Sequence, residues 1–382
     1  MANLADLGRF ILNCRLPDAF STLTLFITSR CDAKCATCFY WQSLNTSGDL
    51  TLEELRTLSR TAPRFDSLWL SGGEPMLRSD LLPALQVFVS GNDVRMINLP
   101  SNGMHADRVE NLVNAILSEH PRLQLWHNVS FDGLEATHDR LRGVRSNFRR
   151  AVEGLTRLQP LRERWRGRFR LNANTVICRD NVEEIMPLAR HAVDQFGLDG
   201  HFFQIIRGTA MDHELMKVPT DRLRDLYREI TPIQDHYARR FVRAGTKSKK
   251  AFGRAAYLGA LTFQNRVQFA NMVAGREWPM ECTSGRTSLV IDHNGDVRAC
   301  ELREPIGNLR EFGCDFGRLF ASAARRAEAA AVRRDRCFCT HICGIQDSLR
   351  HSRRAMFYEI PRAFFTRPRV GSRSGMIPAE RT

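Results

Sequence analysis

Short apolar runs alternate with longer amphipathic stretches through the first half of the chain. Short β-branched or apolar runs are typical of buried strands, whereas apolar residues recurring every three or four positions are typical of helices. This pattern predicts strands at 22–28, 67–71, 94–99, 123–131, 169–177 and 201–206, and helices at 51–60, 80–89, 106–118, 147–158 and 182–196.

Repeated strand–helix units predict a parallel sheet, either a partial barrel or a doubly wound sheet. Local signals support the helices. Thr51 precedes Glu54 by three positions, as in a capping box, and Gly197 follows the fifth helix. We therefore expect an α/β fold built on a partial (β/α)6, TIM-like barrel.

The second half of the chain loses the strand pattern. Residues 208–280 predict a helical insertion or bridge, with the clearest helix at 220–243 and a linker at 245–253. A β-hairpin follows at 287–299, because Asn294-Gly295 suits a tight turn. A helix is predicted at 322–335. The tail beyond Arg350 is rich in Arg, Pro and Gly, and we expect it to be mostly unpacked.

This organisation divides the 382 residues into five parts. We expect an N-terminal extension, the barrel, the helical bridge, a small C-terminal α+β domain and an Arg-rich tail, at 1–21, 22–207, 208–280, 281–345 and 346–382.

The formal net charge is +14, and 51 of the 56 basic residues are Arg. These residues are scattered rather than gathered in one stripe, so nucleic-acid binding is disfavoured. A basic surface suits an acidic electron-donor protein equally well. No apolar run approaches the length of a membrane span, and Met1–Arg30 does not resemble a signal peptide. We expect a soluble, cytoplasmic protein without membrane contact.

Eleven cysteines are many for a cytoplasmic protein, where grouped thiols more often bind metal than form disulfides. Cys31, Cys35 and Cys38 have the spacing C-x3-C-x2-C directly after the first strand. Three thiolates leave an iron position open, and active sites of barrels lie at the carboxyl ends of strands. A zinc site completed by a distant His and ordinary packing cysteines are the alternatives.

The stretch from Cys31 to Phe39 resembles the signature of radical S-adenosylmethionine (radical SAM) enzymes. The resemblance implies a 4Fe-4S cluster on the three cysteines, with Phe39 beside the adenine of SAM. Gly72-Gly73-Glu74-Pro75 resembles the GGEP segment of the family, which contacts the SAM amino group. The chemistry agrees, because glycines allow close backbone approach and Glu74 supplies negative charge.

Two further segments resemble family motifs at consecutive strand ends. Ser101-Asn102-Gly103 resembles a Thr-Asn-Gly turn, and 129–133 with 138–142 resembles the SLDG…HDxxR stretch, whose Ser touches SAM. Side-chain alternation independently turns Ser130 into the barrel lumen, together with Asn174 and Cys178. The cofactor-binding residues we expect are Phe39, Gly72, Gly73, Glu74, Pro75, Asn102, Ser130, Asp132 and Asn174.

A second cysteine group begins with Cys282 and Cys300, with Gly295 five residues before Cys300. This resembles the opening of SPASM and twitch extensions, which hold auxiliary 4Fe-4S clusters. The closing Cys337-x-Cys339-x3-Cys343 departs from the full SPASM pattern, and five thiols are too few for two clusters, which need about eight. We expect one auxiliary 4Fe-4S cluster on Cys282, Cys300 and Cys343, with Cys337 or Cys339 as the fourth ligand. A zinc site that includes His341 is the alternative.

The resemblance implies reductive cleavage of SAM to a 5'-deoxyadenosyl radical, which abstracts hydrogen from a substrate that the sequence does not identify. We expect a net oxidation or modification of a peptide or small molecule, with a flavodoxin or ferredoxin-type electron donor. An epimerase that uses Cys178 as hydrogen donor, a non-catalytic iron-sulfur electron carrier and a nucleic-acid-modifying enzyme are the alternatives.

Overall fold

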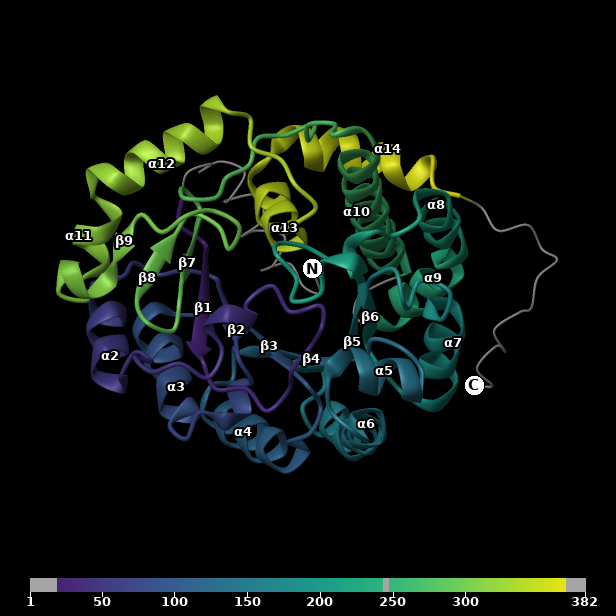
Figure 1. Ribbon diagram of the computed structural model, residues 1–382, viewed down its shortest axis with the longest axis horizontal. Helices are drawn as coiled ribbons and strands as arrows, with labels where there is room; N and C mark the ends of the chain where they lie inside the picture. The colour runs from purple at the N-terminus through teal and green to yellow at the C-terminus, as the bar shows by residue number, and fades with distance from the viewer. Residues whose placement is uncertain (1–18, 243–246, 369–382) are drawn as a thin grey trace.

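The computed structural model describes residues 19–242 and 247–368 and contains a nine-stranded sheet (Figure 1). The strand order is β6-β5-β4-β3-β2-β1-β7-β8-β9, and β1 to β6 are parallel. All six predicted strands are present, with ends shifted by no more than two residues: β1 (Thr22–Thr28), β2 (Ser67–Gly72), β3 (Met96–Ser101), β4 (Gln124–Ser130), β5 (Phe169–Ile177) and β6 (Gly200–Ile205).

Helices join these strands and cover the outer face of the sheet (Figure 1). The capping box is present, since Thr51 and Glu54 exchange hydrogen bonds at the start of the first helix. The short α5 is not predicted by the sequence pattern. The connecting helices are α2 (Leu52–Thr61), α3 (Leu81–Asn92), α4 (Ala106–Glu119), α5 (Glu135–Arg142), α6 (Asn147–Arg164) and α7 (Ile185–Gln195). The prediction of a partial barrel is confirmed, and β6 and β9 end the strand order without pairing to each other among the described residues.

The predicted C-terminal hairpin is β7 (Ser288–Ile291) with β8 (Asp296–Arg298), followed by β9 (Gly307–Asn308). Strand β7 pairs in parallel with β1, and Thr22 lies opposite Ser288. The C-terminal strands therefore extend the barrel sheet. This pairing brings the segment with the later cysteines beside the strand that leads to Cys31.

The helical bridge contains α8 (Thr220–Glu229), α9 (Thr231–Phe241) and α10 (Lys247–Ala274). The single helix predicted at 220–243 is broken after Ile230, where Pro232 occupies the first turn of α9. The linker predicted at 245–253 is wrong from Lys247 onward, because these residues form the first turns of α10. Residues 243–246 lie outside the described residues.

The C-terminal helices are α11 (Phe316–Phe320), α12 (Ala323–Arg334), α13 (Ile342–His351) and α14 (Ile360–Phe365), with a π-helical turn at Ala355–Glu359. The expectation of an unpacked tail is wrong as far as residue 368. Ile360 and Ala363 are buried against Phe263 and Val267 of α10. The arginines of this segment make its overall composition polar, so the composition does not indicate the apolar stripe. Residues 369–382 lie outside the described residues.

A buried carboxylate fastens α13 to the barrel. Asp347 is 2% exposed and accepts hydrogen bonds from the hydroxyls of Thr22 (2.9 Å), Thr283 (3.1 Å) and Thr287 (2.6 Å). These donors lie on β1 and in the segment that leads into β7. Charge-assisted hydrogen bonds of this kind offset the cost of burying the carboxylate. No described helix has the length and apolar composition to cross a membrane.

The packing of α14 on α10 predicts that Ala363→Asp destabilises the protein. Ala363 is 2% exposed, so the new carboxylate would be buried without a partner, at a cost of about 3 kcal/mol. Urea unfolding would measure the change. Arg362→Asp at the exposed neighbouring position is the matched control, with an expected change below about 1 kcal/mol. Equal effects of the two substitutions would mean that α14 does not pack.

Candidate active site

The loop after β1 carries Cys31, Cys35 and Cys38 and is held by backbone hydrogen bonds on two sides. The N–H groups of Lys34 and Ala36 donate to the carbonyls of Arg142 (3.1 Å) and Leu141 (2.9 Å) at the end of α5. On the other side, the N–H groups of Met211 and Asp212 donate to the carbonyls of Cys38 (3.1 Å) and Ala36 (2.9 Å). The segments after β4 and β6 thus shape the cysteine loop at the carboxyl end of the sheet.

The three thiols are largely buried, and one cation lies beside them. Burial raises the pKa of Cys31 to about 12 and that of Cys38 to about 11, and it also raises the pKa of Cys35. The Arg142 guanidinium interacts electrostatically with all three thiols and lies 3.2 Å from the carboxylate of Asp132. A thiolate-held cluster carries negative charge, which Arg142 would balance. The sequence motif contains Arg142 but did not indicate this role.

The second strand ends in a turn that requires glycine, because its backbone lies very close to the backbone of the loop after β1. The N–H of Gly73 donates to the carbonyl of Thr28 (2.8 Å), and the N–H of Glu74 donates to that of Arg30 (2.8 Å). A Cβ atom on Gly73 would overlap the Arg30 carbonyl. This turn therefore holds the backbone that leads into Cys31.

Both oxygens of the Glu74 carboxylate accept hydrogen bonds from the protein itself. Its two oxygens accept the N–H groups of Met76 (3.2 Å) and Asn102 (2.7 Å). Asn102 in turn donates to Asp32 (2.7 Å), which pairs with His105 (2.8 Å). Glu74 thus joins the ends of β2 and β3, a positioning role that the sequence did not predict. Its predicted contact with the SAM amino group stays a prediction.

The residues predicted at the ends of β4 and β5 lie side by side, because Ser130 and Asn174 are paired in register. Asp132 is buried; it receives the Val176 N–H (2.8 Å) and is paired with Arg142. Cys178 is 0% exposed, and burial raises its pKa to about 12. Its role as a hydrogen donor stays a prediction.

Arg207, which follows β6, links this loop to the C-terminal part of the chain. Its guanidinium lies 4.7 Å from the centroid of the Phe39 ring. It donates to Gln204 (3.1 Å) and, through two nitrogens, to Glu301 (3.0 and 3.2 Å). Gln204 donates to Asn174 (2.7 Å). No sequence motif indicated Arg207, because its partners are distant in the chain.

The five later cysteines gather beyond Glu301. Cys282 and Cys337 share a hydrogen bond, and both interact electrostatically with Cys339. Cys300 Sγ lies 3.4 Å from the ring nitrogen Nδ1 of His341. The backbone N–H of His341 donates to Cys339 Sγ (3.3 Å).

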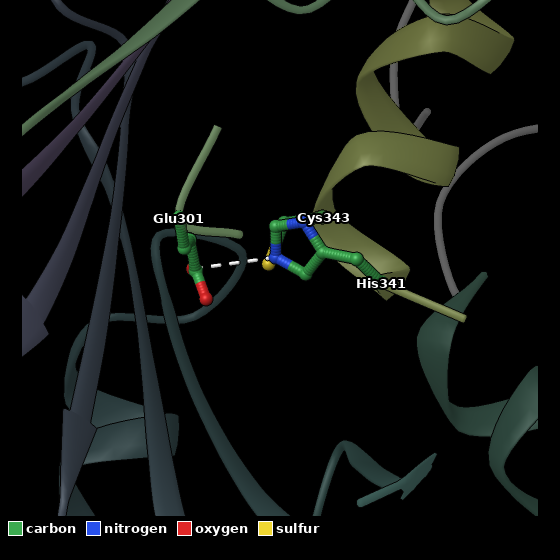
Figure 2. A group of neighbouring side chains, drawn as sticks. All are labelled: Glu301, His341 and Cys343. Atoms are coloured by element: carbon green, nitrogen blue, oxygen red, sulfur yellow. Dashed lines mark ion pairs between the residues drawn. The ribbon is translucent and has the colours of Figure 1, made fainter. Parts of the chain in front are cut away.

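Cys343 lies on the side of His341 that faces Glu301, as Figure 2 shows. The potential ligand atoms of Glu301, His341 and Cys343 lie within 4.8 Å of one another, the one such group of three within residues 19–242 and 247–368. A zinc ion holds sulfur ligands about 4 Å apart. Among the described residues, no three cysteine thiols form such a group of ligand atoms within 4.8 Å of one another.

The Glu301 group fits a zinc ion poorly because its charges are already balanced. Burial alone would raise the pKa of Glu301, but Arg207 and His341 lower it to about 2. Burial acts to lower the pKa of His341, yet Glu301 and the thiols of Cys300 and Cys343 raise it well above its ordinary value. Arg207 and His341 thus both balance the charge of the carboxylate in this arrangement, and zinc would have to displace a proton from His341. The structure favours a buried ion-pair network here.

Comparison with known proteins identifies the barrel. The profile of the Radical SAM superfamily matches residues 25–192, so this part of the chain is a radical SAM domain and the family resemblance is confirmed. That family uses a 4Fe-4S cluster and SAM, and the two cysteine groups fit the cofactor prediction. The individual ligands and SAM contacts stay predictions.

The curated relatives match only part of this chain. The Fe-coproporphyrin III synthase of Methanosarcina barkeri is 30% identical over 155 residues, 39% of this chain and 37% of that protein. The GTP 3',8-cyclase of Pasteurella multocida is 26% identical over 212 residues, 53% of this chain and 59% of that protein. The chain thus spans between about a third and three fifths of these relatives.

Solved structures share the fold over most of the chain. The structure of anSMEcpe with bound AdoMet aligns over 91% of this chain and 96% of its own, with a TM-score of 0.57 and 14% identity. Streptococcus suis SuiB bound to precursor peptide SuiA aligns over 84% of this chain and 69% of its own, with a TM-score of 0.52 and 18% identity. The shared fold therefore includes the C-terminal part.

Because Gly73 lies against the Arg30 carbonyl, we predict that Gly73→Ala disturbs the site of Cys31, Cys35 and Cys38. The added methyl group would push the Arg30 carbonyl away and displace Cys31. We expect a loss of about four irons per chain after anaerobic reconstitution and at least about tenfold weaker SAM binding by calorimetry. Gly317→Ala, whose Cβ lies no closer than 3.2 Å to a side-chain oxygen, is the control and keeps both properties. Wild-type iron and SAM binding in Gly73→Ala would contradict the role of this turn.

Because His138 is buried, we predict that the free energy of unfolding falls at acidic pH. Its Nδ1 accepts the Asp132 N–H (3.0 Å), and its Nε2 bonds to Asn147 Oδ1 (3.0 Å), which requires a neutral ring. Burial lowers its pKa to about 4, so between pH 6.5 and 4 the unfolded chain binds a proton that the folded chain does not. Stability then falls by about 1.4 kcal/mol per pH unit for this group as pH decreases through that range.

Urea unfolding of the apoprotein at several pH values measures this slope. His138→Gln removes one titrating group and flattens the slope by that amount, whereas His213→Gln, at an exposed position, leaves it unchanged. An unaltered slope in His138→Gln would contradict the neutral buried ring.

Proposed function

We propose that the protein is a radical SAM enzyme that oxidises a peptide substrate by removing two hydrogen equivalents. The cofactors supply a 5'-deoxyadenosyl radical for hydrogen abstraction and, at the second cysteine group, an acceptor for the remaining electron. A substrate C–H bond would lose a hydrogen atom to the radical, and the substrate would then lose one electron and one proton. We further propose a cytoplasmic location.

The observation that carries this proposal is the continuous chain of side chains between the two cysteine groups. It runs from Phe39 through Arg207 and Glu301 to His341, and His341 contacts Cys300. Neighbouring residues in this series contact each other directly. The side chains of Arg207, Glu301 and His341 are mostly buried. An electron acceptor beside the site of hydrogen abstraction is what a net oxidation needs.

The protein's own residues position and protect this chemistry. Arg142 balances the charge at Cys31, Cys35 and Cys38, and the turn at Gly73 fixes the loop that carries them. Ser130, Asn174 and Phe39 are proposed to hold SAM. Burial of Cys35 limits the access of water, which would otherwise quench reactive species.

A peptide substrate is supported by two observations. The fold that extends through the C-terminal part is shared with SuiB, whose structure contains a precursor peptide, and with anSMEcpe bound to the Cp18Cys peptide. Beside the proposed SAM site, Asn174 and Gln204 form a hydrogen-bonded carboxamide pair that is partly exposed. Carboxamides offer both donors and acceptors, as recognition of a peptide backbone requires. A small-molecule substrate is the alternative.

The other candidate functions lack a supporting observation. An epimerase needs an accessible thiol, whereas Cys178 is fully buried. A non-catalytic electron carrier would have no use for the segments at 72–75 and 129–133 that resemble the SAM-binding motifs. A nucleic-acid substrate rests on net charge alone.

Iron content and SAM turnover test the proposal. We expect about eight irons per chain after anaerobic reconstitution, falling to about four in Cys31→Ala/Cys35→Ala/Cys38→Ala. Under strong reduction the wild type should form 5'-deoxyadenosine, detected by liquid chromatography, and the triple variant should form none. Incubation with a peptide library should yield products lighter by two hydrogen atoms. SAM binding without 5'-deoxyadenosine formation would indicate a non-catalytic carrier, and about four irons in the wild type would remove the auxiliary acceptor.

A further inference from the structure

A hollow lies at the amino ends of the parallel strands, opposite the cysteine loop. It has a volume of about 330 Å³, and its wall includes the first residues of three strands, Ser67 of β2, Met96 of β3 and Gln124 of β4. Residues of α10, α13 and the π-helical turn complete the wall. The loop that carries Cys31 follows the other end of β1, so the hollow is separate from the candidate active site.

Most of the wall is apolar, and three aromatic side chains belong to it. Trp126 and Phe202 come from β4 and β6, and Tyr257 comes from α10. Aromatic side chains pack against flat rings in offset-stacked or edge-on arrangements. The volume lies at the lower end of the range for small-molecule sites, so the hollow has room for one compact ring compound.

Three carboxamides also belong to this wall, those of Gln124, Gln264 and Gln346. None of these side chains forms a hydrogen bond within the described residues 19–242 and 247–368. Gln264 is only 6% exposed, so bulk water does not freely replace the missing partner. A buried polar group without a partner lowers stability, and native proteins contain few of them. The carboxamide of Gln264 therefore offers a donor and an acceptor to a ligand in the hollow.

The charged residues of the wall already have partners in the protein. Arg95 pairs with Asp93 (2.6 Å), and Arg350 donates to the Ser67 hydroxyl (3.2 Å). Asp66 also has an interaction partner. The groups that remain to recognise a ligand are neutral, which favours a neutral ligand over a phosphate or carboxylate compound.

We propose that the hollow binds a neutral, flat heterocycle with a lactam or amidine edge, the chemistry of a nucleobase or a pteridine. Its ring packs against Trp126, Phe202 and Tyr257, and its N–H and C=O groups exchange hydrogen bonds with the glutamine carboxamides. A purely apolar ligand is disfavoured because it would leave Gln264 without a partner.

A layer of asparagines separates this hollow from the proposed SAM site. Asn128 lies between Trp126 and Ser130 on the inward face of β4. Its amide donates to Asn98, and it accepts a hydrogen bond from the amide of Asn172 (3.1 Å), which is 0% exposed. The ligand in the hollow and SAM therefore bind without excluding each other.

Calorimetry of the full-length protein with adenine and with lumazine, a pteridine-2,4-dione, tests the site. We expect a dissociation constant below about 1 mM for at least one of the two probes. The analogue 1,3-dimethyllumazine keeps the flat ring but lacks the lactam N–H groups, so it should bind at least about tenfold more weakly than lumazine. Saturating SAM should leave these affinities unchanged.

Gln264→Leu removes the carboxamide and keeps a side chain of similar size. It should weaken binding of the better probe at least about tenfold. It should also raise the urea midpoint of unfolding, because it removes a buried polar group that has no partner. Gln195→Leu, at the exposed end of α7, is the matched control and should change neither property.

Four results would overturn the proposal. The first is that neither probe binds the wild type, and the second is that Gln264→Leu binds the probes as tightly as Gln195→Leu does. Displacement of the probe by SAM would place it in the active site instead. A lower urea midpoint in Gln264→Leu would mean that the carboxamide has a partner within the protein. Iron content and 5'-deoxyadenosine formation do not enter this test, so the failure of this proposal is distinguishable from failure of the proposed function.

Discussion

The buried ion pair between Arg207 and Glu301 fixes the relation between the two cysteine groups. The two residues are 94 positions apart, and their side chains are 15% and 3% exposed. Breaking such a pair leaves a buried charge without compensation, at a cost of about 3–5 kcal/mol. His341 Nε2 forms an ion pair with the second carboxylate oxygen (3.3 Å), and the Phe39 ring covers the guanidinium. The barrel and the C-terminal cysteines are therefore held in one arrangement.

The two cysteine groups are built by different means. Backbone hydrogen bonds from α5 and from the segment after β6 shape the loop of Cys31, so short local motifs can specify it. The later cysteines come from two segments, 282–300 and 337–343, which the pairing of β7 with β1 and the hydrogen bonds of Asp347 bring together. Their spacing along the chain can therefore depart from a motif without dispersing the thiols.

This difference explains how much the sequence predicts. The strands are predictable because each is a short apolar run, and the alternation that places Ser130 beside Asn174 follows from strand geometry. Helix α14 was missed because its arginines outnumber a narrow apolar stripe. Arg207 was missed because its importance comes from Glu301 and Phe39, which no local pattern connects to it. Glu74 was expected at the end of the second strand as a SAM contact, which stays a prediction, and its bonds to Met76 and Asn102 appear only in three dimensions.

The buried thiols also couple metal binding to the fold. Cys31 and Cys38 have raised pKa values because burial disfavours their charged forms, so iron must displace protons to bind. Arg142 lowers that cost by interacting with the developing thiolates, and Asp132 holds Arg142 in place. Asp132 in turn accepts a hydrogen bond from the Val176 N–H in the backbone of β5. The same carboxylate thus supports the strand ends and the charge balance of the cysteine loop, which is why the loop and the sheet cannot vary independently.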